Sequence, residues 1–175
     1  IACAMLTLGA GLATAQTYPA KSVRVVVGFA AGGTTDVVAR ILAQRLGEMW
    51  GQNVIVDNRT GASGMIAGDL VARSAPDGYT LLITPQTSLA VAPALYGKAP
   101  YDPIKDLAPI TLAGSAPLLM VVHPSFPPKT FVEFVVLAKK GGPPLTYGSG
   151  GIGSSPHMAG ELFKSMTGTY MVHIP

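Results

Sequence analysis

The feature that most constrains the fold lies in residues 23–46, where an apolar run is joined through two glycines to an amphipathic segment. Residues 23–27 hold four valines, a pattern suited to a strand buried on both faces. Gly32 and Gly33 then let the backbone turn sharply. Apolar residues follow at helical spacing: Val38, Ile41, Leu42, Leu46 and Met49. This strand–turn–helix unit predicts an α/β fold.

The start of this helix also indicates an anion site. We expect Thr34 or Thr35 to be the N-cap, with Asp36 in the first turn. Free amides and the helix dipole favour a carboxylate or phosphate beyond the carboxyl end of the strand. Such turns also occur in α/β proteins that bind nothing there, so both alternatives stay open on these residues alone. Because its charge would repel an anion, Asp36 is expected to brace the loop.

The rest of the chain continues the alternation of strands and helices, which predicts a parallel sheet. Pro76–Gly78 predicts a turn, and Thr130 with Glu133 forms the pattern of a capping box. We place a domain boundary near Pro103, with a first lobe over 16–103 and the start of a second lobe over 104–175. Further strands are expected at 53–57, 79–83, 108–114, 118–122, 145–147 and 170–174; further helices are expected around 66–71, 88–96, 130–140 and 155–167.

Residues 1–15 are predicted to be the remnant of a secretory signal peptide. The segment is apolar and uncharged, is shorter than a membrane-spanning helix, and ends in small residues suited to cleavage after Ala15. An uncleaved membrane anchor is the alternative. Cleavage would also remove Cys3, the one cysteine of the chain, which suits an exported bacterial protein without disulfides.

Composition and motifs exclude several classes of function. The formal net charge of +3 comes without a basic cluster, so we expect no nucleic-acid binding. No nucleophile motif or phosphate-binding P-loop occurs, and the carboxylates are not paired for acid–base chemistry, so no catalytic residue is assigned. The three histidines are too widely spaced to predict a metal site. We expect no cofactor.

A second glycine-rich loop, Gly148–Gly153, lies between an expected strand and an expected helix. It satisfies the G-x-G-x-x-G pattern, so a nucleotide-binding enzyme is an alternative, but no Asp or Glu follows Glu161 to bind a ribose. His157 either donates to a ligand or is bonded to the backbone at the helix start. A carboxylate would suit this loop equally well, because three hydroxyls could join the helix amides as neutral donors: Ser149, Ser154 and Ser155.

Several separate motifs together resemble the Bug family, the periplasmic solute receptors of tripartite tricarboxylate transporters. They occur in the family's order and cover nearly all of residues 18–175. The motifs are Tyr18-Pro19, the Val23–Val27 run, Gly32-Gly33-Thr34-Thr35-Asp36, Val38-Ala39-Arg40, Pro76-Asp77-Gly78-Tyr79-Thr80-Leu81, Tyr101-Asp102-Pro103 and His157-Met158-Ala159-Gly160-Glu161-Leu162-Phe163.

The resemblance implies an α/β, periplasmic-binding-protein-like fold with two domains, a Venus flytrap. Because family members are longer, this chain is expected to be the N-terminal portion, truncated in its C-terminal half. It further implies a periplasmic receptor that holds a small organic acid, a di- or tricarboxylate or a related carboxylate, and passes it to membrane permease subunits. We expect a monomer that is not an enzyme. A ligand sensor for a membrane kinase is a second alternative.

Carried onto this chain, the resemblance implies two contacting stretches, Phe29 to Thr35 and Ser149 to His157. Many relatives have prolines where Gly28, Ala30 and Ala31 stand, so this first loop is expected to be less rigid. Asp36 is assigned to bracing. The predicted ligand-binding residues are Phe29, Ala30, Ala31, Gly32, Gly33, Thr34, Thr35, Gln86, Thr87, Ser149, Gly150, Ser154, Ser155 and His157.

Overall fold

A computed structural model describes residues 17–175 and contains two parallel sheets. The first sheet has the order β2-β1-β3, and its strands are β1 (Val23–Val27), β2 (Val54–Asn58) and β3 (Thr80–Ile83). The second sheet pairs β4 (Leu145–Gly148) with β5 (Met171–Ile174). The predicted parallel α/β architecture is therefore confirmed. The predicted signal peptide and its cleavage after Ala15 lie outside the described residues.

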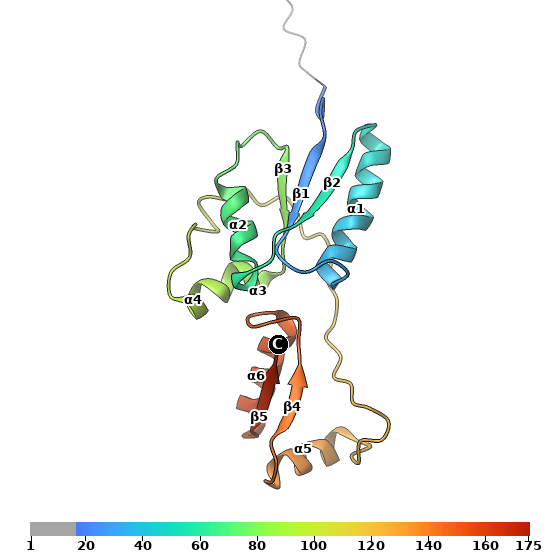
Figure 1. Ribbon diagram of the computed structural model, residues 1–175, viewed down its shortest axis with the longest axis vertical. Helices are drawn as coiled ribbons and strands as arrows, with labels where there is room; N and C mark the ends of the chain where they lie inside the picture. The colour runs from blue at the N-terminus through green and yellow to red at the C-terminus, as the bar shows by residue number, and fades with distance from the viewer. Residues whose placement is uncertain (1–16) are drawn as a thin grey trace, which may run out of the picture.

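Helices flank the first sheet (Figure 1). Helix α1 (Thr34–Trp50) lies along β2, and α2 (Met65–Ala72), which follows the short turn η1 (Ala62–Gly64), lies along β3. The single short helix expected over 88–96 is wrong, because the chain forms α3 (Gln86–Ala90) and α4 (Ala92–Tyr96). Pro93 falls in the first turn of α4, and its missing N–H cannot continue the preceding helix.

The valine run of β1 forms the centre of the core. Val23, Val26 and Val27 have no exposed surface, and Ala39 of α1 packs on the same cluster. A smaller cluster joins α2 to the segment after α4, through Met65, Ala92 and Tyr101. A strand with helices packed beside it explains why β1 carries β-branched residues at nearly every position.

The second sheet is accompanied by α5 (Phe131–Lys139) and α6 (Ser155–Thr167). The predicted capping box is confirmed, because the Thr130 hydroxyl accepts the Glu133 N–H at 3.2 Å. The Glu133 carboxylate accepts the Lys129 N–H at 2.7 Å. Gly168 ends α6 in the left-handed conformation, with φ of 64°.

The strands expected over 108–114 and 118–122 are wrong. This connection has no regular secondary structure, and it passes behind the first sheet on its way from α4 to α5 (Figure 1). Its apolar side chains are largely exposed, with Ile110 at 78% and Leu119 at 83%. A strand requires a neighbour that accepts its hydrogen bonds, and no strand of residues 17–175 pairs with this segment. The domain boundary near residue 103 stays a prediction.

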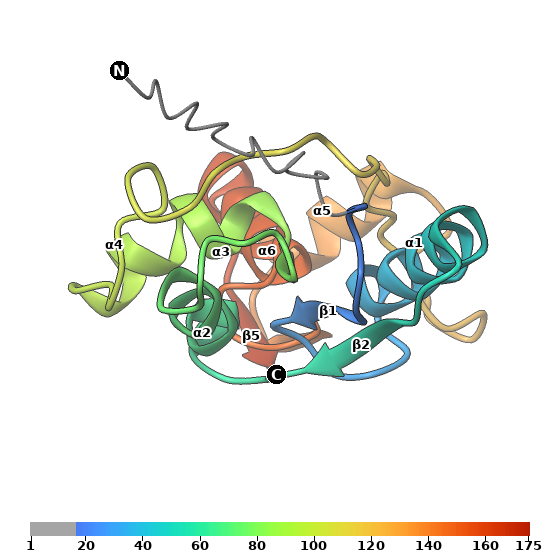
Figure 2. The ribbon, with the colours of Figure 1, turned by 90° about the horizontal axis from the view of Figure 1, so that it is seen from above.

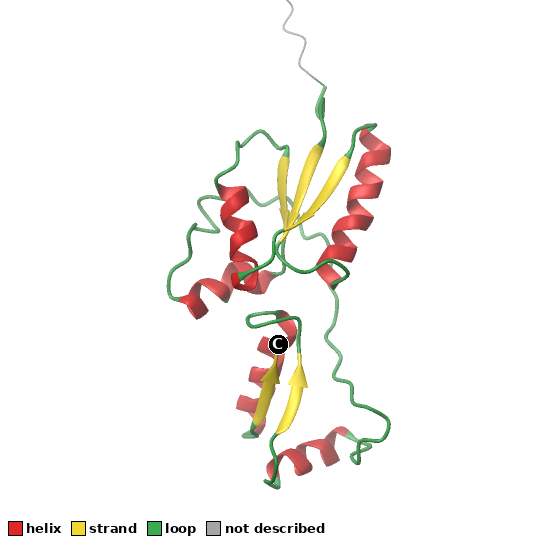
Figure 3. Cartoon of the chain, in the orientation of Figure 1, coloured by secondary structure: helices red, strands yellow, loops and turns green. Residues whose placement is uncertain are grey.

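The strands of each sheet are directed toward the other sheet (Figure 1). We call the elements from β1 to α4 the first lobe and those from α5 to β5 the second lobe. The carboxyl ends of β1, β2 and β3 face the second lobe, and those of β4 and β5 face the first (Figures 1 and 3). Seen from above, α6 and β5 fall beneath α2 and α3 (Figure 2). Within residues 17–175, no helix has the length and apolar character needed to cross a membrane.

Candidate functional site

The first glycine loop leaves β1 at its carboxyl end and turns directly into α1. The predicted N-cap at Thr34 or Thr35 is wrong, because extended Gly33 is the N-cap and both threonines already belong to the helix. Gly33 has the extended backbone that is usual at an N-cap, with φ of −73° and ψ of 165°, and glycine is among the residues accepted there. Within the described residues no side chain caps α1, so the amides of its first turn remain available to a ligand.

Asp36 binds the loop rather than the helix start. The residue is 1% exposed, and its Oδ2 accepts the Gly32 N–H at 2.8 Å and the Arg40 Nε–H at 2.9 Å. Hydrogen bonding to Arg40, followed by the bonds from Gly32 and Asn58, holds the pKa of Asp36 far below its usual range. Asp36 is therefore ionised at neutral pH, with its charge matched by Arg40.

Asn58 joins this network from the end of β2, and the sequence reasoning missed it. Its Nδ2 donates to Asp36 Oδ1 and to the Phe29 carbonyl, each at 2.9 Å. Its Oδ1 accepts Arg40 Nη2 at 3.1 Å. The available signal was its position directly after the strand expected over 53–57, at the sheet edge where the first loop also begins. Asn58 thus ties β2 to the loop and to its acidic residue.

Phe29, Gly64 and Ser88 pack closely together, and the Ser88 hydroxyl is a further group that the sequence reasoning missed. A Cβ placed on Gly64 would come within 2.8 Å of Ser88 Oγ and 3.3 Å of the Phe29 ring. Ser88 is fully buried, and its Oγ has no hydrogen-bond partner among the described residues; the same holds for Thr84 Oγ1. Buried hydroxyls usually have a partner, so both are candidate donors to a bound ligand.

Most hydroxyls of the second glycine loop are used to build the loop itself. Ser149 Oγ accepts the Gly151 N–H at 3.1 Å and lies 2.6 Å from His173 Nε2. Ser154 Oγ donates to the Gly151 carbonyl at 2.7 Å and does not cap α6. Ser155 instead faces Thr87 of the first lobe, with 3.4 Å between their hydroxyl oxygens. Gln86 and Gly150 are exposed.

The sequence left two alternatives for His157, and the structure shows the second: the histidine is bonded to the backbone at the helix start. Its Nδ1 accepts the Gly153 N–H at 3.0 Å. Its ring lies against that of His173, with 4.1 Å between centroids and an angle of 36° between the ring planes, and its Nε2 lies 3.9 Å from Glu161 Oε1. The same arrangement occurs at Asp36, which also accepts an N–H from a glycine four residues earlier.

The two lobes meet through Ser63, which the sequence reasoning did not single out. Its hydroxyl donates to the Ile152 carbonyl of the second loop and lies 3.3 Å from the Tyr96 hydroxyl. Ser63 has φ of 56°, a conformation uncommon for a residue with a side chain. Gly153, with φ of +77°, has no room for a side chain, because a Cβ there would lie 2.3 Å from Ser63 Oγ.

Cations near the two loops are already paired with acidic residues. Arg24 and Arg59 both bind Asp57, and Lys164 binds Glu161 at 2.8 Å. The Lys164 ammonium, followed by the Tyr147 hydroxyl, lowers the pKa of Glu161. The donors left at the loops are therefore amides and hydroxyls. Residues 17–175 hold no group of three or more His, Cys, Asp or Glu placed to bind a metal ion.

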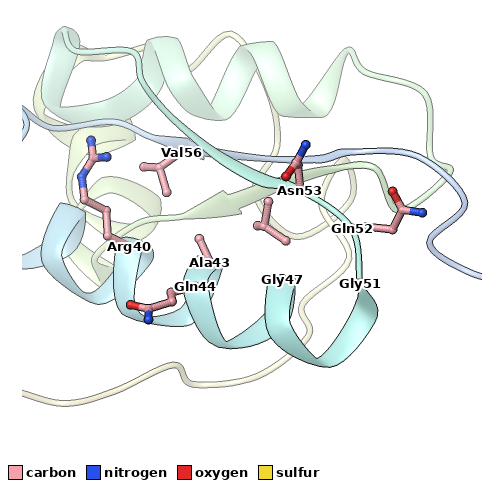
Figure 4. A pocket seen from close by; sticks show the side chains of 9 residues that line it. Arg40, Ala43, Gln44, Gly47, Gly51, Gln52, Asn53 and Val56 are labelled. Carbon is pink, nitrogen blue, oxygen red and sulfur yellow. The ribbon is translucent and has the colours of Figure 1, made fainter.

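One surface pocket lies away from these loops. It has a volume of about 480 Å³ and lies between α1 and β2 (Figure 4). A second pocket of about 450 Å³ lies in the second lobe beside Phe126 and Phe134. None of the predicted ligand-binding residues lines either pocket. The first is lined by Arg40, Ala43, Gln44, Gly47, Gly51, Gln52, Asn53, Val54 and Val56.

Comparison with known proteins gives a consistent result. The family described as tripartite tricarboxylate transporter family receptor matches residues 38–175. Protein BugT of Bordetella pertussis is 38% identical over 163 residues, which are 93% of this chain and 50% of BugT. The chain spans about half the length of the curated relatives it matches.

Two solved structures resemble the fold closely and name a bound acid. MatC from Rhodopseudomonas palustris, with bound malate, has a TM-score of 0.82 at 34% identity, over 90% of this chain and 54% of MatC. An R. palustris protein with adipate has a TM-score of 0.79 at 36% identity, over 90% of this chain and 53% of that protein. The fold is therefore that of periplasmic binding proteins, as the resemblance implied.

Proposed function

Because this chain belongs to the tripartite tricarboxylate transporter receptor family, we propose that it captures a small organic acid between its two lobes. The acid would be a di- or tricarboxylate or a related carboxylate. The protein would act in the periplasm after cleavage behind Ala15, as a monomer without cofactor or catalysis, and would deliver the acid to membrane permease subunits. The relatives with bound malate and adipate support this ligand class.

The observation that carries the proposal is the pair of helix starts at the facing ends of the two sheets. Helices α1 and α6 both begin directly after a glycine loop, and no side chain of the described residues caps either one. Each loop is instead held by a side chain of the helix's first turn, Asp36 or His157. Two such sets of free amides suit the two carboxylates of one short acid.

The proposed contacting residues divide into two roles. We assign direct contact to the first-turn amides of both helices, with Phe29 as the apolar wall and Ser88 as a buried donor. We assign the bracing of the loops to Asp36 and to the hydroxyls that are bonded within the second loop, Ser149 and Ser154. We also propose that the boundary between the two lobes lies near residue 103. The relatives do not support a nucleotide-dependent enzyme or a kinase sensor.

Thermal unfolding in the presence of candidate acids tests the proposal. A ligand that binds the folded state at about 100 times its Kd stabilises it by about 2.7 kcal/mol. For a chain of this size that corresponds to a rise in Tm of about 5–10 °C. The screen would include malate, adipate, a tricarboxylate and aromatic acids, with the diamide of malic acid and NAD as controls.

We expect at least one acid to raise the Tm, and the neutral diamide to leave it unchanged. A rise with NAD alone, or no rise with any acid at concentrations up to solubility, would refute a carboxylate receptor. Salt at about 0.5 to 1 M screens ion pairs at the surface. A rise in Tm that persists in such salt would therefore agree with binding through amides and hydroxyls.

A further inference from the structure

A cluster of titratable groups lies behind the second glycine loop. The rings of His157 of α6 and His173 of β5 lie against each other with 4.1 Å between centroids, and the Tyr147 ring of β4 lies 5.1 Å from that of His173. Glu161 faces His157 and binds Lys164. From the first lobe, the groups that touch this loop are the hydroxyls of Ser63 and Thr87.

His157 can hold the loop in only one protonation state. Its Nδ1 accepts the Gly153 N–H at 3.0 Å, so this nitrogen must carry no proton. A second proton on the ring would set two N–H groups against each other and release Gly153. Gly153 in turn packs against Ser63 of the first lobe, because a Cβ there would lie 2.3 Å from Ser63 Oγ. Loss of the contact would therefore disturb the loop where the lobes meet.

His173 makes protonation of the pair less favourable. Its Nε2 lies 2.6 Å from Ser149 Oγ, and burial, followed by the nearby His157, lowers the pKa of His173. Lys164 acts in the same direction, and Glu161 opposes it. Glu161 already accepts the Tyr147 hydroxyl at 2.7 Å and Lys164 Nζ at 2.8 Å, so its charge is shared among several donors. Two imidazolium rings this close together would also repel each other.

We propose that His157 and His173 are positioning residues of the second glycine loop, and that proton uptake by the pair releases Gly153 and weakens capture of an organic acid. The claim about capture rests on the proposed function. The claim about the loop does not. Because Nδ1 of His157 accepts the Gly153 N–H only while it carries no proton, acidification would loosen the loop.

Two substitutions at position 157 separate positioning from titration. His157→Asn keeps an acceptor near Nδ1 and removes the titrating ring. His157→Phe keeps a flat ring on His173 and removes the acceptor. His123→Asn is the matched control, because His123 is exposed and its side chain bonds only to Ser125, two residues on, among the described residues.

The first measurement is the hydrogen exchange and NMR shift of the Gly153 amide in the whole chain, followed from pH 8 to 5 without any ligand. After correction for the intrinsic pH dependence of exchange, we expect protection of the Gly153 amide to fall as the pH is lowered in the native chain and in His123→Asn. It should stay level in His157→Asn and be low throughout in His157→Phe. A level profile in the native chain, or an unchanged slope in His157→Asn, would overturn the positioning role.

The second measurement is the Kd for malate by calorimetry over the same range. Malate itself gains a proton in acid, so each variant is compared with the native chain at the same pH. We expect affinity to fall more steeply in the native chain than in His157→Asn, and equal slopes would overturn the link to capture. If malate and the other acids fail to bind at any pH, the receptor proposal fails, while the amide profile still decides the role of His157.

Discussion

Gly160 permits the close approach of α6 to β4, and its replacement by alanine provides a strong test of the second lobe. A Cβ on Gly160 would lie 2.3, 2.6 and 2.9 Å from three atoms of the Tyr147 ring and hydroxyl. Tyr147 is held in place, because its hydroxyl donates to Glu161 at 2.7 Å and its ring lies against His173. Burial, followed by the bond to Glu161, raises the pKa of Tyr147 to about 12, so the hydroxyl keeps its proton. Gly160→Ala must therefore displace either the tyrosine or the helix.

The expected cost combines two opposing effects. Adding a methyl group to a packed site costs roughly 1–3 kcal/mol, and contacts below 3 Å with a held ring place this case at about 3. Alanine gains about 1 kcal/mol over glycine inside a helix. The net loss is about 2 kcal/mol in the free energy of unfolding. It corresponds to a fall in Tm of about 4–8 °C for a chain of this size.

Urea unfolding followed by circular dichroism measures this loss. Gly47→Ala in α1 is the matched control, because its new Cβ would meet only the Gln52 carbonyl, at 3.3 Å. We expect that control to be neutral or slightly stabilised. In the double variant Gly160→Ala with Tyr147→Leu, the two effects should couple by at least about 1 kcal/mol, because both residues occupy one contact. Equal stability of Gly160→Ala and Gly47→Ala, or strict additivity in the double variant, would refute the packing described.

Three further predictions follow from local contacts. Thr130→Ala removes the cap of α5 and should lower the free energy of unfolding by about 1 kcal/mol in urea; no change would mean that the capping box is not formed in solution. Ser88→Ala should change ligand-free stability by less than about 0.5 kcal/mol, because its hydroxyl has no partner among the described residues, and should reduce the Tm shift with malate; a large loss without ligand would contradict this. Hydrogen bonds from Arg40 and Arg24 lower the pKa values of Asp36 and Asp57, respectively, so the unfolded chain binds their protons more readily. The stability that they contribute is present above the ordinary carboxyl pKa of about 4 and is lost as the pH falls through the lowered values, so the urea midpoint should drop between pH 7 and 3; a constant midpoint would contradict this.

Local sequence was sufficient for the elements whose stability depends on their own residues. The valine run of β1, the helices that start after glycine loops and the Thr130–Glu133 cap are found where the pattern predicts them. The family could likewise be predicted, because its motifs are short and keep their order along the chain.

Prediction failed where an element depends on a distant partner. Residues 108–122 have the composition of strands, but a strand forms only beside another backbone, and the described residues offer none there. The N-cap of α1 was misplaced because Gly33 takes that position without a side-chain cap, whereas a hydroxyl residue is the usual sign of an N-cap in a sequence. Asn58 and Ser63 were missed for a related reason, since each acts on a segment far from it in the chain.

The sequence by itself determined that two glycine loops each lead from a strand into a helix, because strand and helix preference and glycine's backbone freedom are properties of short segments. Only the tertiary structure decided what holds those loops. In the first loop, Asp36 accepts the Gly32 N–H and is bonded to Asn58. In the second loop, His157 and Ser149 accept backbone N–H groups of the loop itself, and Ser63 of the first lobe donates to the Ile152 carbonyl. Hydrogen bonds depend on distance and direction in space, and residues 89 positions apart acquire both only when the chain is folded.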